Sequence, residues 1–148
     1  MAILEENRIQ LGATAVDKSD AIRQAGQLLV QSGCVEPAYV DGMLAREETM
    51  STYLGNGVAI PHGMFENRGD IKQTGISVLQ LPQGIEWEDG EKAHLVIGIA
   101  ASSDEHVGVL ANLAEVIEDE DMTNKLIHTT DPALILAQLG KEQAEEES

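Results

Sequence analysis

Histidines are the residues of this chain best suited to chemistry at neutral pH, because a free imidazole loses its proton at about pH 6.5. The chain has four of them. His62 follows a short apolar run and lies between Pro61 and Gly63. Proline limits how the chain can approach this position, and glycine lets the backbone come close to a ligand or partner. The pattern indicates an oriented ring at a strand end, which can act as a nucleophile when neutral. A turn histidine without function is the alternative.

His106 is the second candidate because of its place in a predicted helix. Ser102 and Glu105 have the spacing of a capping box, which puts His106 in the first turn of that helix, on its inward stripe. The positive end of a helix favours a nearby anion and keeps a neighbouring imidazole neutral. A core histidine that bonds a backbone carbonyl is the alternative interpretation.

Arg46 is one of only nine basic residues and lies near the end of another predicted helix. Its alternative interpretation is that it complements the helix dipole or pairs with a neighbouring glutamate. His94 and His128 are interpreted as structural, and Cys34 as a small packing residue. His62 and His106 with a carboxylate offer ligands for a metal, but no metal-ligand spacing is present, and phosphate-loop and dinucleotide motifs are absent. We therefore expect no cofactor.

Helices mixed with strands must position these residues. The apolar spacing predicts helices over about residues 19–32, with Ser19 as its cap, and 37–48, 102–117, 122–128 and 132–139. It predicts strands over 58–60, 76–81 and 94–101, of which the last reads as a buried central strand, and a turn over 55–57. This order predicts one α/β domain over residues 1–140, with a sheet packed between helices. Residues 141–148 read as an acidic, solvated tail.

The composition excludes several classes of function. In 148 residues, 26 Asp and Glu stand against 9 Lys and Arg, so the formal charge is −17. Such a chain repels nucleic-acid backbones and anionic membranes. One cysteine rules out an internal disulfide, and the longest apolar stretch, residues 95–101, is too short to span a bilayer. We expect a cytoplasmic protein with no nucleic-acid partner and no membrane insertion.

One run, TYLGNGVAIPHG at residues 52–63, resembles the signature of the enzyme IIA components of the bacterial sugar phosphotransferase system. Within that superfamily the chain is most similar to the mannitol type. The resemblance extends over about residues 8 to 140, and it includes residues 35–40, 44–47, 95–101, 105–107 and 128–130. Asn56 and Met64 depart from the mannitol pattern, and Asn56-Gly57 is closer to fructose and nitrogen-regulatory relatives.

The resemblance implies a phosphotransferase with a mixed five-stranded sheet. In the family, the phosphocarrier HPr donates a phosphoryl group to a histidine, which passes it to a cysteine of a IIB component for sugar uptake. The phosphorylated histidine matches His62, the second active-site histidine matches His106, and the active-site arginine matches Arg46. IIB is then expected on a separate chain, with mannitol as the sugar. A regulatory IIA-like module and an inert scaffold are the alternatives.

Phosphoryl transfer also requires local positive potential in so acidic a chain. The sources that the sequence offers are Arg46, the helix start at residues 102–106 and the backbone amides near Gly63. Such transfer asks mainly for positioning and charge stabilisation, so no metal is required if these groups converge.

Overall fold

The structure, a computed structural model, describes residues 4–88, 90–101 and 103–140, without the side chains of Phe65 and of residues 103–107. Its strands form one open sheet in the order β1-β4-β5-β3-β2. They are β1 (Ile9–Gln10), β2 (Tyr53–Gly55), β3 (Val58–Ala59), β4 (Gly75–Glu88) and β5 (Glu91–Ala100). β5 lies in the middle, antiparallel to β4 and parallel to β3. The predictions of a mixed five-stranded sheet and of a central strand near residues 94–101 are confirmed.

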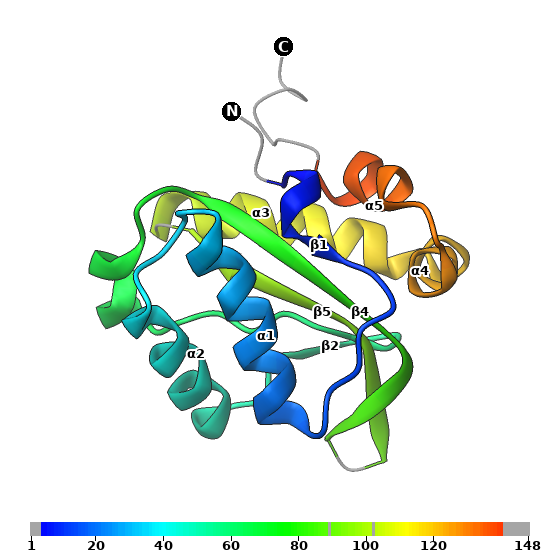
Figure 1. The fold of residues 1–148 in the computed structure, drawn as a ribbon, viewed down its shortest axis with the longest axis horizontal. Coiled ribbons are helices and arrows are strands. Elements are labelled where there is room, and N and C mark those ends of the chain that lie inside the picture. The colour runs from blue at the N-terminus through cyan, green and yellow to red at the C-terminus, as the bar shows by residue number, and fades with distance from the viewer. Residues whose placement is uncertain (1–3, 89, 102, 141–148) are drawn as a thin grey trace.

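Helices cover both faces of the sheet. α1 (Lys18–Gln31) and α2 (Ala38–Thr49) pack on one face, while α3 (Ser103–Glu118), α4 (Glu120–His128) and α5 (Pro132–Leu139) pack on the other (Figure 1). Two short 3-10 helices complete the fold: η1 (Glu6–Arg8) precedes β1, and η2 (Phe65–Asp70) lies between β3 and β4. The predicted α/β sandwich is therefore confirmed. Among the helices described, none has both the length and the apolar character needed to cross a bilayer.

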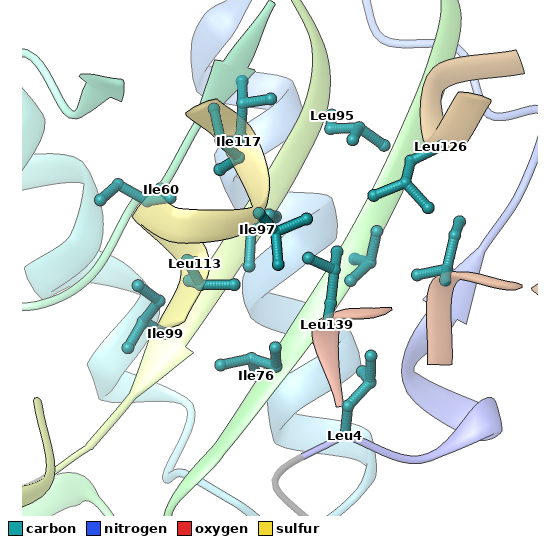
Figure 2. Close-up of a cluster of buried hydrophobic side chains, with 14 of the residues drawn as sticks. Leu4, Ile60, Ile76, Leu95, Ile97, Ile99, Leu113, Ile117, Leu126 and Leu139 are labelled. Carbon is teal, nitrogen blue, oxygen red and sulfur yellow. The ribbon is translucent and has the colours of Figure 1, made fainter. Parts of the chain in front are cut away.

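The two cores follow from the alternation of side chains along β5. Leu95, Ile97 and Ile99 point to the layer of α3, α4 and α5, whereas Val96 and Ala100 pack against α1 and α2. Figure 2 shows the first of these clusters, in which residues of β5 meet residues of α3 and α5. A strand buried on both faces reads as a continuous apolar run, which is why the sequence indicated its central place.

Several predicted boundaries are wrong. Asp17, not Ser19, caps α1, because its carboxylate accepts the backbone N–H of Asp20 at 2.8 Å. β4 does not end at Leu81 but continues to Glu88, since a register irregularity between Gln80 and Ile85 absorbs the interruption. β1 and β2 were not predicted, because two or three residues are too few to show a period.

Two other predictions concern residues or side chains that lie outside the described part of the chain. The predicted capping box at Ser102 and Glu105 and the acidic tail at 141–148 belong to this group.

A substitution in the central strand tests this packing directly. Ile97 is fully buried, so Ile97→Ala should lower the free energy of unfolding by about 2–5 kcal/mol through lost burial and a cavity. Leu54 is 39% exposed, and Leu54→Ala should cost about 0.5 kcal/mol or less. Urea unfolding of the two variants measures both values. Equal costs would contradict the layer assignment.

Candidate phosphoryl-transfer site

His62 lies just beyond β3, at the carboxyl end of this strand. Its backbone forms an isolated parallel bridge with Ile99 of β5, and the Ile99 N–H donates to Pro61 O at 3.0 Å. Its half-buried ring brings Nδ1 to 2.8 Å from the carbonyl oxygen of Ile60. A carbonyl only accepts, so Nδ1 must carry the proton and the lone pair of the neutral ring lies on Nε2. The local chain therefore selects which nitrogen is nucleophilic.

Tyr39 of α2 holds the loop that carries this histidine. Its hydroxyl donates to Ile99 O at 2.8 Å and accepts the N–H of Gly63 at 2.9 Å. Burial raises the pKa of Tyr39, and the Gly63 hydrogen bond lowers it by less, so the hydroxyl keeps the proton that it donates. Gly63 has to be glycine here, since a Cβ would lie 2.7 Å from the Tyr39 ring. The Gly63 amide is already paired with the Tyr39 hydroxyl, and the expectation that the amides near Gly63 supply positive potential to the site stays a prediction.

Asn67 fixes the next part of the same loop. Its side-chain oxygen accepts the N–H of Met64 at 2.8 Å, and its own N–H donates to Met64 O. The amide packs so closely on α2 that any side chain at Gly42 would overlap it. Two contacts with α2, through Tyr39 and Asn67, thus hold the segment that follows His62.

Arg46 lies in the last turn of α2, and its Nη1 donates to Met50 O at 2.7 Å. Tyr53 pairs with Ala59 in antiparallel register, and the Ile60 N–H donates to Thr52 O at 3.0 Å. Arg46 therefore bonds the backbone that follows the end of α2, and its part in phosphoryl transfer stays a prediction.

His106 lies in the first turn of α3, which begins at Ser103 directly after β5. Because His62 is bridged to Ile99, near the end of β5, the positive end of α3 and the His62 loop meet at one sheet edge. The side chain of His106 lies outside the described residues, so its orientation toward His62 stays a prediction.

Comparison with known proteins identifies this arrangement. Residues 2–142 match the family model "Phosphoenolpyruvate-dependent sugar phosphotransferase system, EIIA 2". The chain belongs to this family. The resemblance to phosphotransferase-system IIA components is therefore confirmed.

The relatives of this EIIA domain agree. A multiphosphoryl transfer protein of Haemophilus influenzae is 53% identical over 133 residues, which are 90% of this chain but 27% of that protein. The crystal structure of IIA mannitol from Escherichia coli superposes with a TM-score of 0.85 at 42% identity, covering 91% of this chain and 97% of that one. The complex of enzyme IIAMTL and phosphorylated enzyme IIBMTL from Escherichia coli gives 0.85 at 41%, covering 92% and 97%. The EIIA domain thus spans about a quarter of the first relative and nearly all of the solved mannitol domains.

The other histidines of the EIIA domain lie away from this edge. His94 packs against Gly84, and its Nδ1 is 3.2 Å from Leu81 O. His128 is exposed at the end of α4, with Nδ1 2.9 Å from Asn124 O. Of the side chains that the structure describes, no three His, Cys, Asp or Glu are grouped to hold a metal ion. Tyr39 and Asn67 were missed, because nothing in the local sequence shows which distant backbone group a side chain meets.

The Tyr39 hydroxyl makes the first test of the loop. Tyr39→Phe should cost about 1–3 kcal/mol of unfolding free energy, because it leaves buried partners without a hydrogen bond. It should also speed hydrogen exchange at the Gly63 amide. The other tyrosine is a matched control: the Tyr53 hydroxyl accepts the N–H of Gly57 at 3.0 Å, so Tyr53→Phe should leave Gly63 exchange unchanged.

The same hydroxyl sets a pH dependence. Since the folded pKa of Tyr39 is raised, the unfolded chain loses this proton first, and stability should fall as the pH rises above about 10. The fall should be shallower in Tyr39→Phe. Unchanged hydrogen exchange at the Gly63 amide in Tyr39→Phe would contradict the role of the Tyr39 hydroxyl in holding the loop.

Proposed function

We propose that this EIIA domain is a phosphoryl carrier of the sugar phosphotransferase system. His62 accepts a phosphoryl group from HPr on Nε2 and passes it to a cysteine of a IIB component. The observation that carries the proposal is the Nδ1 contact with Ile60 O, which directs the lone pair of His62 to Nε2 within the family motif.

The transfer needs little covalent chemistry from the protein. The Nε2 lone pair forms the new bond to phosphorus while the bond from phosphorus to the donor breaks, and the donor leaves with that electron pair. The proton on Nδ1 stays in place, and the Ile60 carbonyl stabilises the positive charge that the ring gains. In the second transfer, sulfur attacks phosphorus and the electron pair returns to Nε2.

Positive potential is the second requirement of the site. The described backbone supplies it through the N-terminus of α3, beside the His62 bridge to Ile99. We assign to Arg46 and His106 the stabilisation of the phosphoryl oxygens. Both act on a group in transit, so neither needs to be the nucleophile.

The partners and the sugar follow from the relatives. A solved mannitol IIA domain complexed with phosphorylated IIB supports a separate IIB chain as the acceptor. The mannitol-specific EIICBA component of Pasteurella multocida is 43% identical, whereas the nitrogen-regulatory IIA-Ntr of Neisseria meningitidis is 27% identical. This difference favours sugar transport over the regulatory alternative, with mannitol as the proposed sugar and the cytoplasm as the location. Transfer from the phosphorylated domain to mannitol and fructose IIB, measured side by side, tests the sugar.

The phosphorylated residue can be tested directly. Incubation with phosphoenolpyruvate, enzyme I and HPr should add one phosphoryl group, seen by intact mass measurement under non-acidic conditions. His62→Gln should fold and stay unmodified. His128→Gln removes another histidine whose Nδ1 meets a carbonyl, and it should be modified like the wild type. Modification that survives His62→Gln would exclude the assignment.

The supporting residues should change rate rather than site. His106→Ala and Arg46→Ala should still be phosphorylated on His62 but exchange the group about a hundredfold more slowly, because each loses a charge-stabilising donor. Rapid-quench transfer from HPr measures the rates. Transfer at the wild-type rate in His106→Ala would mean that His106 has no part in the site.

A further inference from the structure

Glu47 is a buried carboxylate that the proposed chemistry does not use. The residue is 6% exposed and lies in the last turn of α2, next to Arg46. It accepts hydrogen bonds from the N–H of Thr52 at 3.1 Å, from the Thr52 hydroxyl, and from Trp87 Nε1 at 3.0 Å. Lys18 Nζ lies 3.5 Å from the same carboxylate.

These donors come from parts of the chain that are far apart in sequence. Lys18 begins α1, Trp87 is near the end of β4, and Thr52 precedes β2. In Figure 1 the start of α1 and the end of α2 lie at the same end of this helix pair. A buried carboxylate without partners would be very costly, so its donors have to stay in place around it. Glu47 therefore fixes the position of the Thr52 backbone relative to α1, α2 and β4.

A chain of hydrogen bonds leads from this carboxylate to the His62 ring. The Thr52 carbonyl accepts the Ile60 N–H at 3.0 Å, and the Ile60 carbonyl accepts Nδ1 of His62 at 2.8 Å. Glu47 thus holds one side of Thr52, and the other side of Thr52 holds the residue that orients the imidazole. Between the Glu47 carboxylate and the His62 ring, this path consists of the backbone N–H and carbonyl groups of Thr52 and Ile60.

We propose that Glu47 is a positioning residue of the phosphoryl-transfer site, which sets the orientation and tautomer of His62 through Thr52 and Ile60. The proposal rests on the proposed function of His62 as the phosphoryl acceptor. It explains why a carboxylate is buried one residue from Arg46: the same turn of α2 anchors Met50 through Arg46 and Thr52 through Glu47. Of these two anchored residues, Thr52 bonds Ile60 directly.

Glu47→Gln is the sharpest test, because the two side chains have the same shape. The Thr52 N–H bonds both carboxylate oxygens, at 3.1 and 3.2 Å, so an amide NH2 in either orientation would face this donor and displace Thr52. Movement of Thr52 shifts the Ile60 carbonyl away from Nδ1. In 15N spectra of the ring nitrogens, the share of the Nδ1–H tautomer of His62 should fall. Phosphorylation by HPr should slow by about 10- to 100-fold, as misplacement by about 1 Å can cost that much.

Three variants separate positioning from charge and stability. Glu48→Gln makes the same change at the next residue, and it should leave the His62 tautomer unchanged. Glu48 is exposed and lines a cavity of about 150 Å³ between α1 and α2, which Glu47 also lines. Trp87→Phe removes a donor that lies outside the path to His62. It should lower the unfolding free energy but leave the tautomer in place. Glu47→Asp keeps the charge, and its share of the Nδ1–H tautomer and its phosphorylation rate should lie between those of Glu47→Gln and of the wild type.

The tautomer is read in the unphosphorylated protein, so its outcome does not depend on the carrier function. A changed tautomer in Glu47→Gln but not in Glu48→Gln supports the positioning role, even if HPr fails to modify the wild type and the proposed function is lost. An unchanged tautomer with a wild-type rate overturns the role, even if His62 is phosphorylated. If Glu47→Gln does not fold, Glu47→Asp takes its place: it ends one carbon short of the Thr52 N–H, and a wild-type His62 tautomer there overturns the proposal equally.

Discussion

The contact between His62 Nδ1 and the Ile60 carbonyl is the interaction on which the site depends. An imidazole has two nitrogens of similar basicity, and a carrier whose lone pair moved between them would present its nucleophile in two directions. A carbonyl two residues back removes this ambiguity, but only if the backbone between them is held. Pro61 limits that backbone, its carbonyl accepts from β5, and Tyr39 bonds the amide of Gly63 on the far side of the ring. Together these contacts restrain the backbone on both sides of the imidazole.

The topology explains why this loop lies where a phosphoryl group can be stabilised. β3 is parallel to the central strand, so its carboxyl end lies beside the carboxyl end of β5, where α3 begins. A parallel neighbour and a following helix bring a strand-end side chain and a helix N-terminus together without any long-range ion pair. The remaining surface carries an excess of negative charge, so the backbone dipole of α3 is valuable here.

The sequence was sufficient for the fold class, the central strand and the place of His62 at a strand end, because each has a local signal. Residues 94–101 are apolar throughout, and His62 is framed by proline and glycine. The supporting contacts have no such signal. Glu47 reads as one of 26 acidic residues, and only the packing of α1, α2 and β4 shows that it is buried against Trp87 and Lys18. Asp17 was missed as the cap of α1 for a related reason, since several polar residues precede that helix and the geometry decides among them.

A carrier has to release the group that it accepts, and this constrains how strongly the site can hold phosphate. Tight binding of the phosphorylated state would favour the first transfer at equilibrium and slow the second, because stabilising a ground state raises the barrier to leaving it. The groups that we propose for the site would hold phosphate with moderate strength: a helix N-terminus, which acts as about half a charge, and Arg46, whose guanidinium also bonds a backbone carbonyl. A formal charge of −17 further disfavours a retained phosphoryl group. Precise placement of Nε2, rather than strong attraction to phosphate, is therefore the means by which this fold can favour transfer in both directions, and that is what the bonds of Tyr39 and Glu47 secure.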